Sequence, residues 1–298
     1  MRPWSSSTTR AAVQVADRPG LWLPGALAWT VTIGWLALVV GVVRPPSTAG
    51  LTFAGAGIVT SGAWPWNAVG LGAAALGIAL LAFGLAAAGE ASLLIGPRAS
   101  ARDVARVMLL GLVCAAPTLL AILALATATA IVAPLEFNAP NQQLGPLPRT
   151  MGRLAPFLVA IAVAASAGAA VHAAAIRAMA EGRTVMDALR SSPRLLARAG
   201  RSALSQAGAI LTARVAYLAV SATLLRVLWA PIDDRLAVGG MEPAAALLLV
   251  GFVAIWLCLV LGGGALHAWG SVSWTAVLGT SAPGPGSGRE RMETSIGR

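Results

Sequence analysis

The sequence predicts an all-α membrane protein that crosses the bilayer six times. Of its 298 residues 57% are hydrophobic and only 11% are charged, and the mean hydropathy is +0.78. Soluble domains carry about a quarter charged residues, so the composition indicates a lipid environment. Six apolar runs are each long enough to cross a hydrocarbon layer of about 30 Å as a helix. The polar segments between them are too short to bury a core, so we expect one membrane domain.

The runs follow one another along almost the whole chain. The first is longer than the apolar core of a secretory signal, and residues 1–20 precede it, so we expect an uncleaved helix. A cytoplasmic N-terminal segment (1–20), a six-helix domain (21–280) and a disordered cytoplasmic tail (281–298) are expected. The predicted spans are residues 21–43, 68–95, 107–133, 156–176, 203–229 and 243–269.

The basic residues predict the orientation of these spans. All 21 are arginines, and fifteen of them fall in the segments on one side of the predicted membrane, against five on the other. Cytoplasmic loops carry such an excess, so both termini are expected on the cytoplasmic side of a cell membrane. The net charge of +10 therefore indicates topology, and a nucleic-acid partner is not expected. The expected partners are the bilayer and its anionic headgroups.

A basic pattern occurs twice on this side. Arg98 precedes Asp103-Val-Ala-Arg106, and Arg183 precedes Asp187-Ala-Leu-Arg190. Aspartate in the first turn of a short helix favours the helix dipole, and an arginine one turn later can contact lipid phosphate. The pattern predicts short interfacial amphipathic helices at the cytoplasmic face. The expected headgroup contacts are Arg98, Arg102, Arg106, Arg183, Arg190, Arg194 and Arg198.

The even-numbered spans end alike, in Ala-Gly-Glu90-Ala, Ala-Val-His172-Ala and Ala-Leu-His267-Ala. A polar residue at the same position of three spans predicts three similar helical hairpins. Small residues are also frequent inside the spans and predict close helix packing. They gather at residues 72–77, 164–168 and 262–264.

With these spans, these hairpins and the stretch from Gly182 to Leu196, the chain resembles a broad group of bacterial six-helix membrane proteins. That group includes the membrane domain fused to some glycerophosphodiester phosphodiesterases. The resemblance covers residues 21–278 and implies the fold. It carries over no catalytic residue, because the phosphodiesterase activity belongs to a separate barrel domain for which this chain has no room.

Ionisable residues inside the spans predict a polar cluster. Arg214 falls near the middle of the fifth span and Glu90 in the second, and each charge costs about 2.5–3.5 kcal/mol at the centre of a helix unless it finds a partner. We expect Glu90 to pair with Arg214, with His172 and His267 close by. Such a cluster could relay protons or hold an anionic group. An interhelical ion pair that only fixes helix register explains the same residues.

Three classes of function stay open. The first is a permease-type or transport-associated component for a small solute or lipid-related molecule. The second is a non-catalytic scaffold or a subunit of a larger complex, with a protein partner or as a homo-oligomer. The third is an intramembrane enzyme acting on lipid, which no catalytic motif supports. A zinc site would need Glu90, His172 and His267 to converge, and we expect neither a metal nor another cofactor.

Overall fold

The computed structural model describes residues 4–43, 57, 60–94, 99–137, 146–180, 182–239 and 243–279. These residues form helices and turns and contain no strand. Six of the helical segments are long and apolar enough to cross a membrane, which confirms the predicted all-α class. Arg98 and the predicted tail, 281–298, lie outside the described residues.

The first span is interrupted and the other five are continuous. It consists of α2 (Trp22–Trp29), a π-helical segment η2 (Thr30–Gly34) and α3 (Trp35–Val42), after the short 3-10 turn η1 (Pro19–Leu21). The continuous helices extend past the predicted spans, because their polar ends go on as helix outside the apolar run. They are α5 (Trp66–Leu94), α6 (Ala101–Phe137), α7 (Pro146–Ala180), α9 (Arg201–Gly239) and α10 (Pro243–Gly279).

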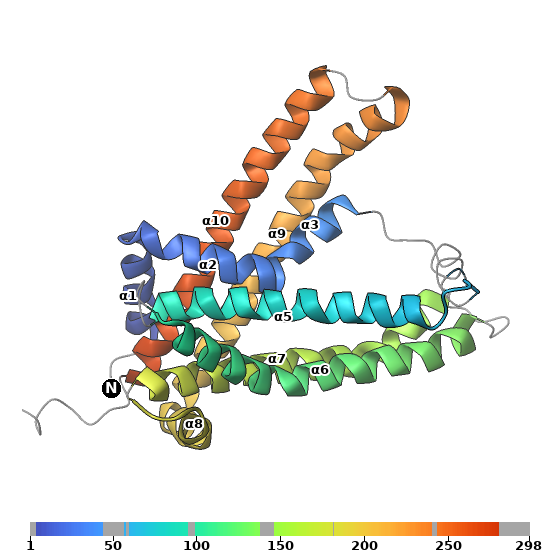
Figure 1. The fold of residues 1–298 in the computed structure, drawn as a ribbon. Helices are drawn as coiled ribbons and strands as arrows, with labels where there is room; N and C mark the ends of the chain where they lie inside the picture. The colour runs from blue at the N-terminus through green and yellow to red at the C-terminus, as the bar shows by residue number, and fades with distance from the viewer. Residues whose placement is uncertain are drawn as a thin grey trace, which may run out of the picture.

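The long helices form two arms that meet at one end and diverge at the other (Figure 1). Helices α5, α6 and α7 make a three-helix arm, and α9 and α10 make a two-helix arm. The first span joins them, because α2 packs on both α5 and α10 while α3 packs on α9. The predicted hairpins are therefore present as contacts of α2 with α5, α6 with α7 and α9 with α10.

A helix that the sequence did not predict, α1 (Trp4–Ala16), covers the end where the arms meet. Its apolar residues Ala11 and Val15 are buried against α10. The indole Nε1 of Trp269 donates to the Thr8 carbonyl at 3.2 Å, and that of Trp22 to the Val15 carbonyl at 2.9 Å. The N-terminal segment is thus part of the folded domain.

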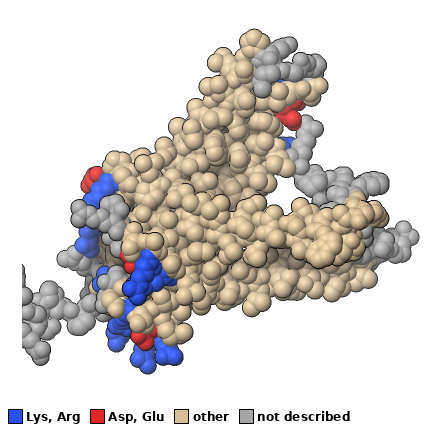
Figure 2. All heavy atoms as spheres, in the orientation of Figure 1, with Lys and Arg blue, Asp and Glu red and all other residues tan. Residues whose placement is uncertain are grey.

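The second amphipathic helix, α8 (Val185–Ala199), lies at the same end and is seen nearly end-on in Figure 1. Thr184 caps it and bonds with Asp187 in its first turn. Ala188 and Ser192 are buried while the arginines of α8 point outward. Basic side chains gather at this end in Figure 2, which we call the basic end. Its exposed arginines include Arg102, Arg106, Arg183, Arg190, Arg194 and Arg198.

The first copy of the basic pattern differs from the prediction. Asp103 does not start a short interfacial helix but lies in the first turn of the spanning helix α6. There its carboxylate accepts the Ser100 backbone N–H at 3.0 Å, and the Asp103 N–H points back to the Ser100 hydroxyl at 3.3 Å. Arg106 is 3.9 Å from the same carboxylate. Ser100 and Asp103 therefore cap α6 together, and Thr184 with Asp187 caps α8 by similar hydrogen bonds.

Close packing at small residues is present at two of the three predicted stretches. A Cβ on Gly264 would lie 2.4 Å from the Trp22 carbonyl oxygen, and one on Gly168 would lie 2.4 Å from that of Cys114. Gly72 and Gly77 have nothing within 4 Å, so for their stretch the prediction was wrong. Small residues in lipid-exposed and buried positions look alike in a sequence, because the surrounding lipid is as apolar as a neighbouring helix.

Candidate functional site

A polar cavity of about 150 Å³ lies where the two arms meet. Its walls come from α5, α7, α9, α10 and the π-helical segment η2. All four residues that the sequence singled out line it, namely Glu90, His172, Arg214 and His267. Residues from four spans thus converge in one place, although up to 177 positions separate them along the chain.

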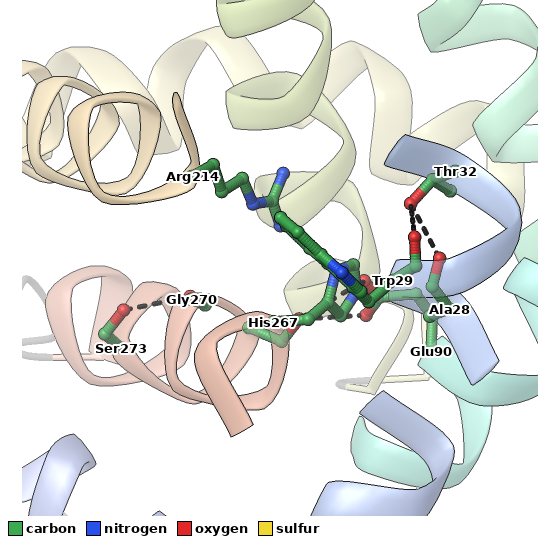
Figure 3. A network of polar contacts seen from close by, with 9 residues as sticks. Ala28, Trp29, Thr32, Glu90, Arg214, His267, Gly270 and Ser273 are labelled. Carbon is green, nitrogen blue, oxygen red and sulfur yellow. Dashed lines mark hydrogen bonds and ion pairs between the residues drawn. The ribbon is translucent and has the colours of Figure 1, made fainter. Parts of the chain in front are cut away.

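Three of these side chains form a bonded relay (Figure 3). Arg214 Nη2 lies 3.3 Å from His267 Nδ1, and His267 Nε2 lies 2.5 Å from Glu90 Oε1. Because the guanidinium can only donate, Nδ1 accepts, and the imidazole proton sits on Nε2 and is donated to Glu90. The direct Glu90–Arg214 pair expected from the sequence is therefore replaced by a pair joined through His267.

The relay is electrically neutral in this arrangement. Glu90 carries the negative charge, Arg214 the positive charge, and His267 is uncharged because one of its nitrogens accepts. Ser271 donates its hydroxyl to the Glu90 carboxylate at 3.1–3.2 Å. A balanced and hydrogen-bonded set of charges is the form in which ionised groups survive inside a membrane protein.

Two atoms at the cavity are left without partners. His172 Nε2 and Arg214 Nε are buried, and neither has a hydrogen-bond partner in the part of the chain that the structure describes. Buried polar atoms are nearly always paired, with protein or with water. In either tautomer the imidazole nitrogen needs a partner, and the guanidinium N–H needs an acceptor. The cavity therefore offers a donor and a titratable nitrogen to something other than protein.

A larger apolar pocket of about 620 Å³ adjoins the polar cavity. It lies between the first span and the three-helix arm, and Thr32, Ala169 and His172 line both spaces. Its size falls within the 300–1,000 Å³ usual for ligand pockets. The residues that line the two spaces recur every three or four positions along a helix, as in Ala79, Ala82, Ala86 and Glu90 of α5. Residues at this spacing lie on one face of a helix, so the same face borders both spaces.

A third space of about 420 Å³ lies at the basic end, between α1, α7 and α10. Arg10 and Arg177 line it together with Ser7 and Gln14. Thr275 lines both this basic pocket and the polar cavity. The apolar pocket, the polar cavity and the basic pocket thus follow one another, each sharing lining residues with the next.

A second charged cluster joins α6 to α7 at the ends far from the relay. Glu136 is 3% exposed and accepts from Arg149 Nε at 2.6 Å and from Arg153 Nε at 2.7 Å. Arg149 also donates to the Glu136 carbonyl at 2.6 Å. Glu136 lies beyond the apolar span, and the hydrogen bond from Arg149 lowers the pKa of its carboxyl group. We interpret this cluster as a structural clasp of the hairpin.

The sequence did not single out several polar residues of the site. Ser271 is four residues after His267, one turn along the same face of α10, which is a usable signal. Buried Gln206 of α9 donates a hydrogen bond to Ser273 of α10 beside the cavity. Gln206 precedes Arg214 by eight residues and so lies on the same face of α9. Thr32 lines the cavity from the π-helical segment, whose altered register no pattern in the sequence predicts.

The described residues contain no group of three or more His, Cys, Asp and Glu side chains placed to hold a metal ion. Glu90, His172 and His267 line one cavity, but they are not placed so that all three could bind one metal ion. Cys114 is buried and Cys258 is exposed, and both are free thiols.

The chain was also compared with known proteins. No protein-family model, no curated protein and no solved structure matches it. Its membrane class thus rests on the six apolar helices.

Proposed function

We propose that this multi-pass membrane protein is a permease that moves an amphiphilic, lipid-related molecule across the bilayer. The observation that carries the proposal is the direct junction of the apolar pocket with the polar cavity at Thr32, Ala169 and His172. An acyl or similar apolar chain would occupy the first space, and its polar head the second. A small polar solute would leave about 620 Å³ of apolar space without a matching group.

The shape of the molecule supports a transport path. In Figure 2 a notch separates the two arms, which diverge away from the basic end. We place the basic end, with α1 and α8, at the cytoplasmic face, as the arginine distribution predicts. The path would then run from the notch through the apolar pocket and the polar cavity to the basic pocket with Arg10 and Arg177.

The proposal is tested by lipid translocation in vesicles. The purified protein is reconstituted into phosphatidylethanolamine–phosphatidylglycerol vesicles with fluorescent phosphatidylglycerol in both leaflets, and a membrane-impermeant quencher reports how fast inner-leaflet probe becomes accessible. We expect the wild type to exceed protein-free vesicles and Arg214→Gln to lose most of this rate, because the variant removes the buried cation of the cavity.

The matched control is Arg226→Gln, which makes the same substitution three turns further along α9 at an exposed position. It should keep the wild-type rate. Equal rates for the wild type and protein-free vesicles would refute the permease, and equal rates for both variants would exclude the polar cavity from the path.

A scaffold is the second candidate, and one observation favours it. The Arg214–His267–Glu90 relay is neutral and its three side chains are joined by hydrogen bonds, which is what a device that only fixes helix register requires. A scaffold does not account for the unpartnered atoms or the adjoining pockets. The enzyme has less support, since the Ser271 hydroxyl bonds to Glu90 and not to a histidine that could activate it.

A further inference from the structure

We infer that the transported amphiphile is a monoanion, and that its oxyanion enters the polar cavity together with one proton, which His172 carries. The inference rests on the proposed function and adds the charge of the substrate and the ion that accompanies it. It follows from the charge balance of the cavity and from the two buried atoms that lack partners.

The charge balance excludes an unaccompanied anion. The relay of Glu90, His267 and Arg214 is neutral, so an oxyanion placed beside it would leave one uncompensated negative charge. Uncompensated charge inside a membrane protein is strongly unfavourable. The unpartnered Arg214 Nε–H can donate a hydrogen bond to the oxyanion, but the charge of Arg214 already offsets that of Glu90. One further positive charge is needed.

His172 is the group that can supply this charge. The charged and titratable groups around it are Glu90 on α5, Arg214 on α9 and His267 on α10, with Cys114 on α6 in the adjoining pocket. The residues of η2 that line the two spaces, Val31 and Thr32, carry no charge and do not titrate. Both nitrogens of His267 already take part in hydrogen bonds. Protonation would place a hydrogen on Nδ1, so that two donors, Nδ1–H and the Arg214 N–H, would face each other without an acceptor. His172 Nε2 has no such obstacle, because it has no partner.

Protonated His172 completes an oxyanion site. Its Nε2–H, which lies beside Gly111 of α6 where the apolar pocket adjoins the polar cavity, would be one donor, and the Arg214 Nε–H would be the other. The polar cavity of about 150 Å³ has room for a few water molecules or one headgroup oxyanion, at roughly 30 Å³ per water. The proton comes from water on the side where the anion enters and leaves with it on the other side. No net charge crosses the bilayer, and no bond of the substrate is broken.

The test imposes a pH gradient on the same vesicles. One proton for each monoanion makes the two leaflets differ by up to about tenfold in fluorescent phosphatidylglycerol for each pH unit, because one unit is a tenfold ratio in proton activity. The probe should collect in the leaflet on the alkaline side faster than in protein-free vesicles. Zwitterionic fluorescent phosphatidylcholine should show no bias.

The variant His172→Gln should abolish the bias of phosphatidylglycerol, while Cys258→Ala, at an exposed thiol that lines none of the three spaces, should retain it. Because His172→Gln could also disturb folding, a second readout uses the wild type alone. Pyranine inside vesicles that start at equal pH on both sides should report acidification when phosphatidylglycerol added outside moves inward.

The outcomes separate the two proposals. Translocation without a gradient response and without acidification would overturn the proton inference and leave the permease standing. Translocation of phosphatidylcholine with the same gradient response would overturn it as well. If neither probe moves, the permease fails and the inference fails with it.

Discussion

At the residue scale, the imidazole of His267 determines how the charges of Glu90 and Arg214 are paired inside the membrane domain. His267 accepts from Arg214 and donates to Glu90, so a single tautomer hydrogen-bonds to both groups and separates them by the width of its ring. Because His267 bonds to both groups, the Glu90 carboxylate on α5 and the Arg214 guanidinium on α9 need no direct contact. The two charges still balance each other, and each depends on the other.

The first prediction tests this dependence. Glu90→Leu and Arg214→Leu should each destabilise the protein by about 3–5 kcal/mol, because each leaves an uncompensated buried charge. The double variant should recover more than half of that loss, since it removes both charges. Unfolding in detergent, followed by the fluorescence of the ten tryptophans, measures the effect. Additive losses in the double variant would show that the relay does not couple the two residues.

The second prediction concerns the Glu136 clasp and acid. The pKa of Glu136 is lowered from 4.5, chiefly by the Arg149 hydrogen bond, so the clasp stabilises the folded state above pH 4.5 and is lost as the pH falls through the lowered pKa. Glu136→Gln should lower the Tm at neutral pH and flatten its decline in acid. Arg149→Gln should cost more than Arg153→Gln, whose side chain is 62% exposed. Parallel acid profiles for wild type and Glu136→Gln would contradict this.

At the element scale, a helix could be predicted where its residues form a long apolar run or a recognisable pattern of polar positions. The long apolar runs and the matching positions of Glu90, His172 and His267 predicted the hairpins. The residues of the cavity were predictable because a buried charge needs a partner and the spans contain few polar side chains that could be one. Helix α1 was missed because only a short stripe with Ala11 and Val15 is apolar. The role of His267 between the charges depends on side-chain angles that no spacing reveals.

The third prediction uses two glycines of α10. Gly264→Ala places a Cβ 2.4 Å from the Trp22 carbonyl and should push α2 away from α10, at a cost of about 1–3 kcal/mol, as overpacking usually does. Gly251→Ala meets nothing within 4 Å and should be neutral or slightly stabilising through its helix propensity. Thermal unfolding in detergent compares the two. Equal effects would mean that the α2–α10 contact is not tight.

At the scale of the whole molecule, the divergence of the arms could not be predicted from the sequence. Helix faces toward lipid and toward other helices are equally apolar, so the runs carry no signal for which helices stay together. The structure puts three helices in one arm and two in the other, and α2 with α3 bridges them. The π-helical segment η2 (Thr30–Gly34) divides this bridge, and its Thr32 lines both central spaces.

A π-helical turn at such a point is a place where a helix can change direction, and such turns are frequent at functional sites. Because α2 packs on α5 and α10 while α3 packs on α9, bending at η2 would change the angle between the arms and the shape of the cavity together. A permease needs this movement to close the notch over its substrate, whereas a scaffold needs the arms to stay fixed.

The fourth prediction follows from this difference. Spin labels at Leu123 of α6 and Leu247 of α10, both exposed, are introduced after Cys114→Ala and Cys258→Ala and report the distance between the arms. For a permease we expect a broad distance distribution that shortens and narrows with phosphatidylglycerol, because the lipid favours one arm angle. Labels at Leu123 and Val159, within the three-helix arm, should not respond. A narrow inter-arm distance that phosphatidylglycerol leaves unchanged would favour the scaffold, since a rigid bridge cannot carry a lipid past the polar cavity.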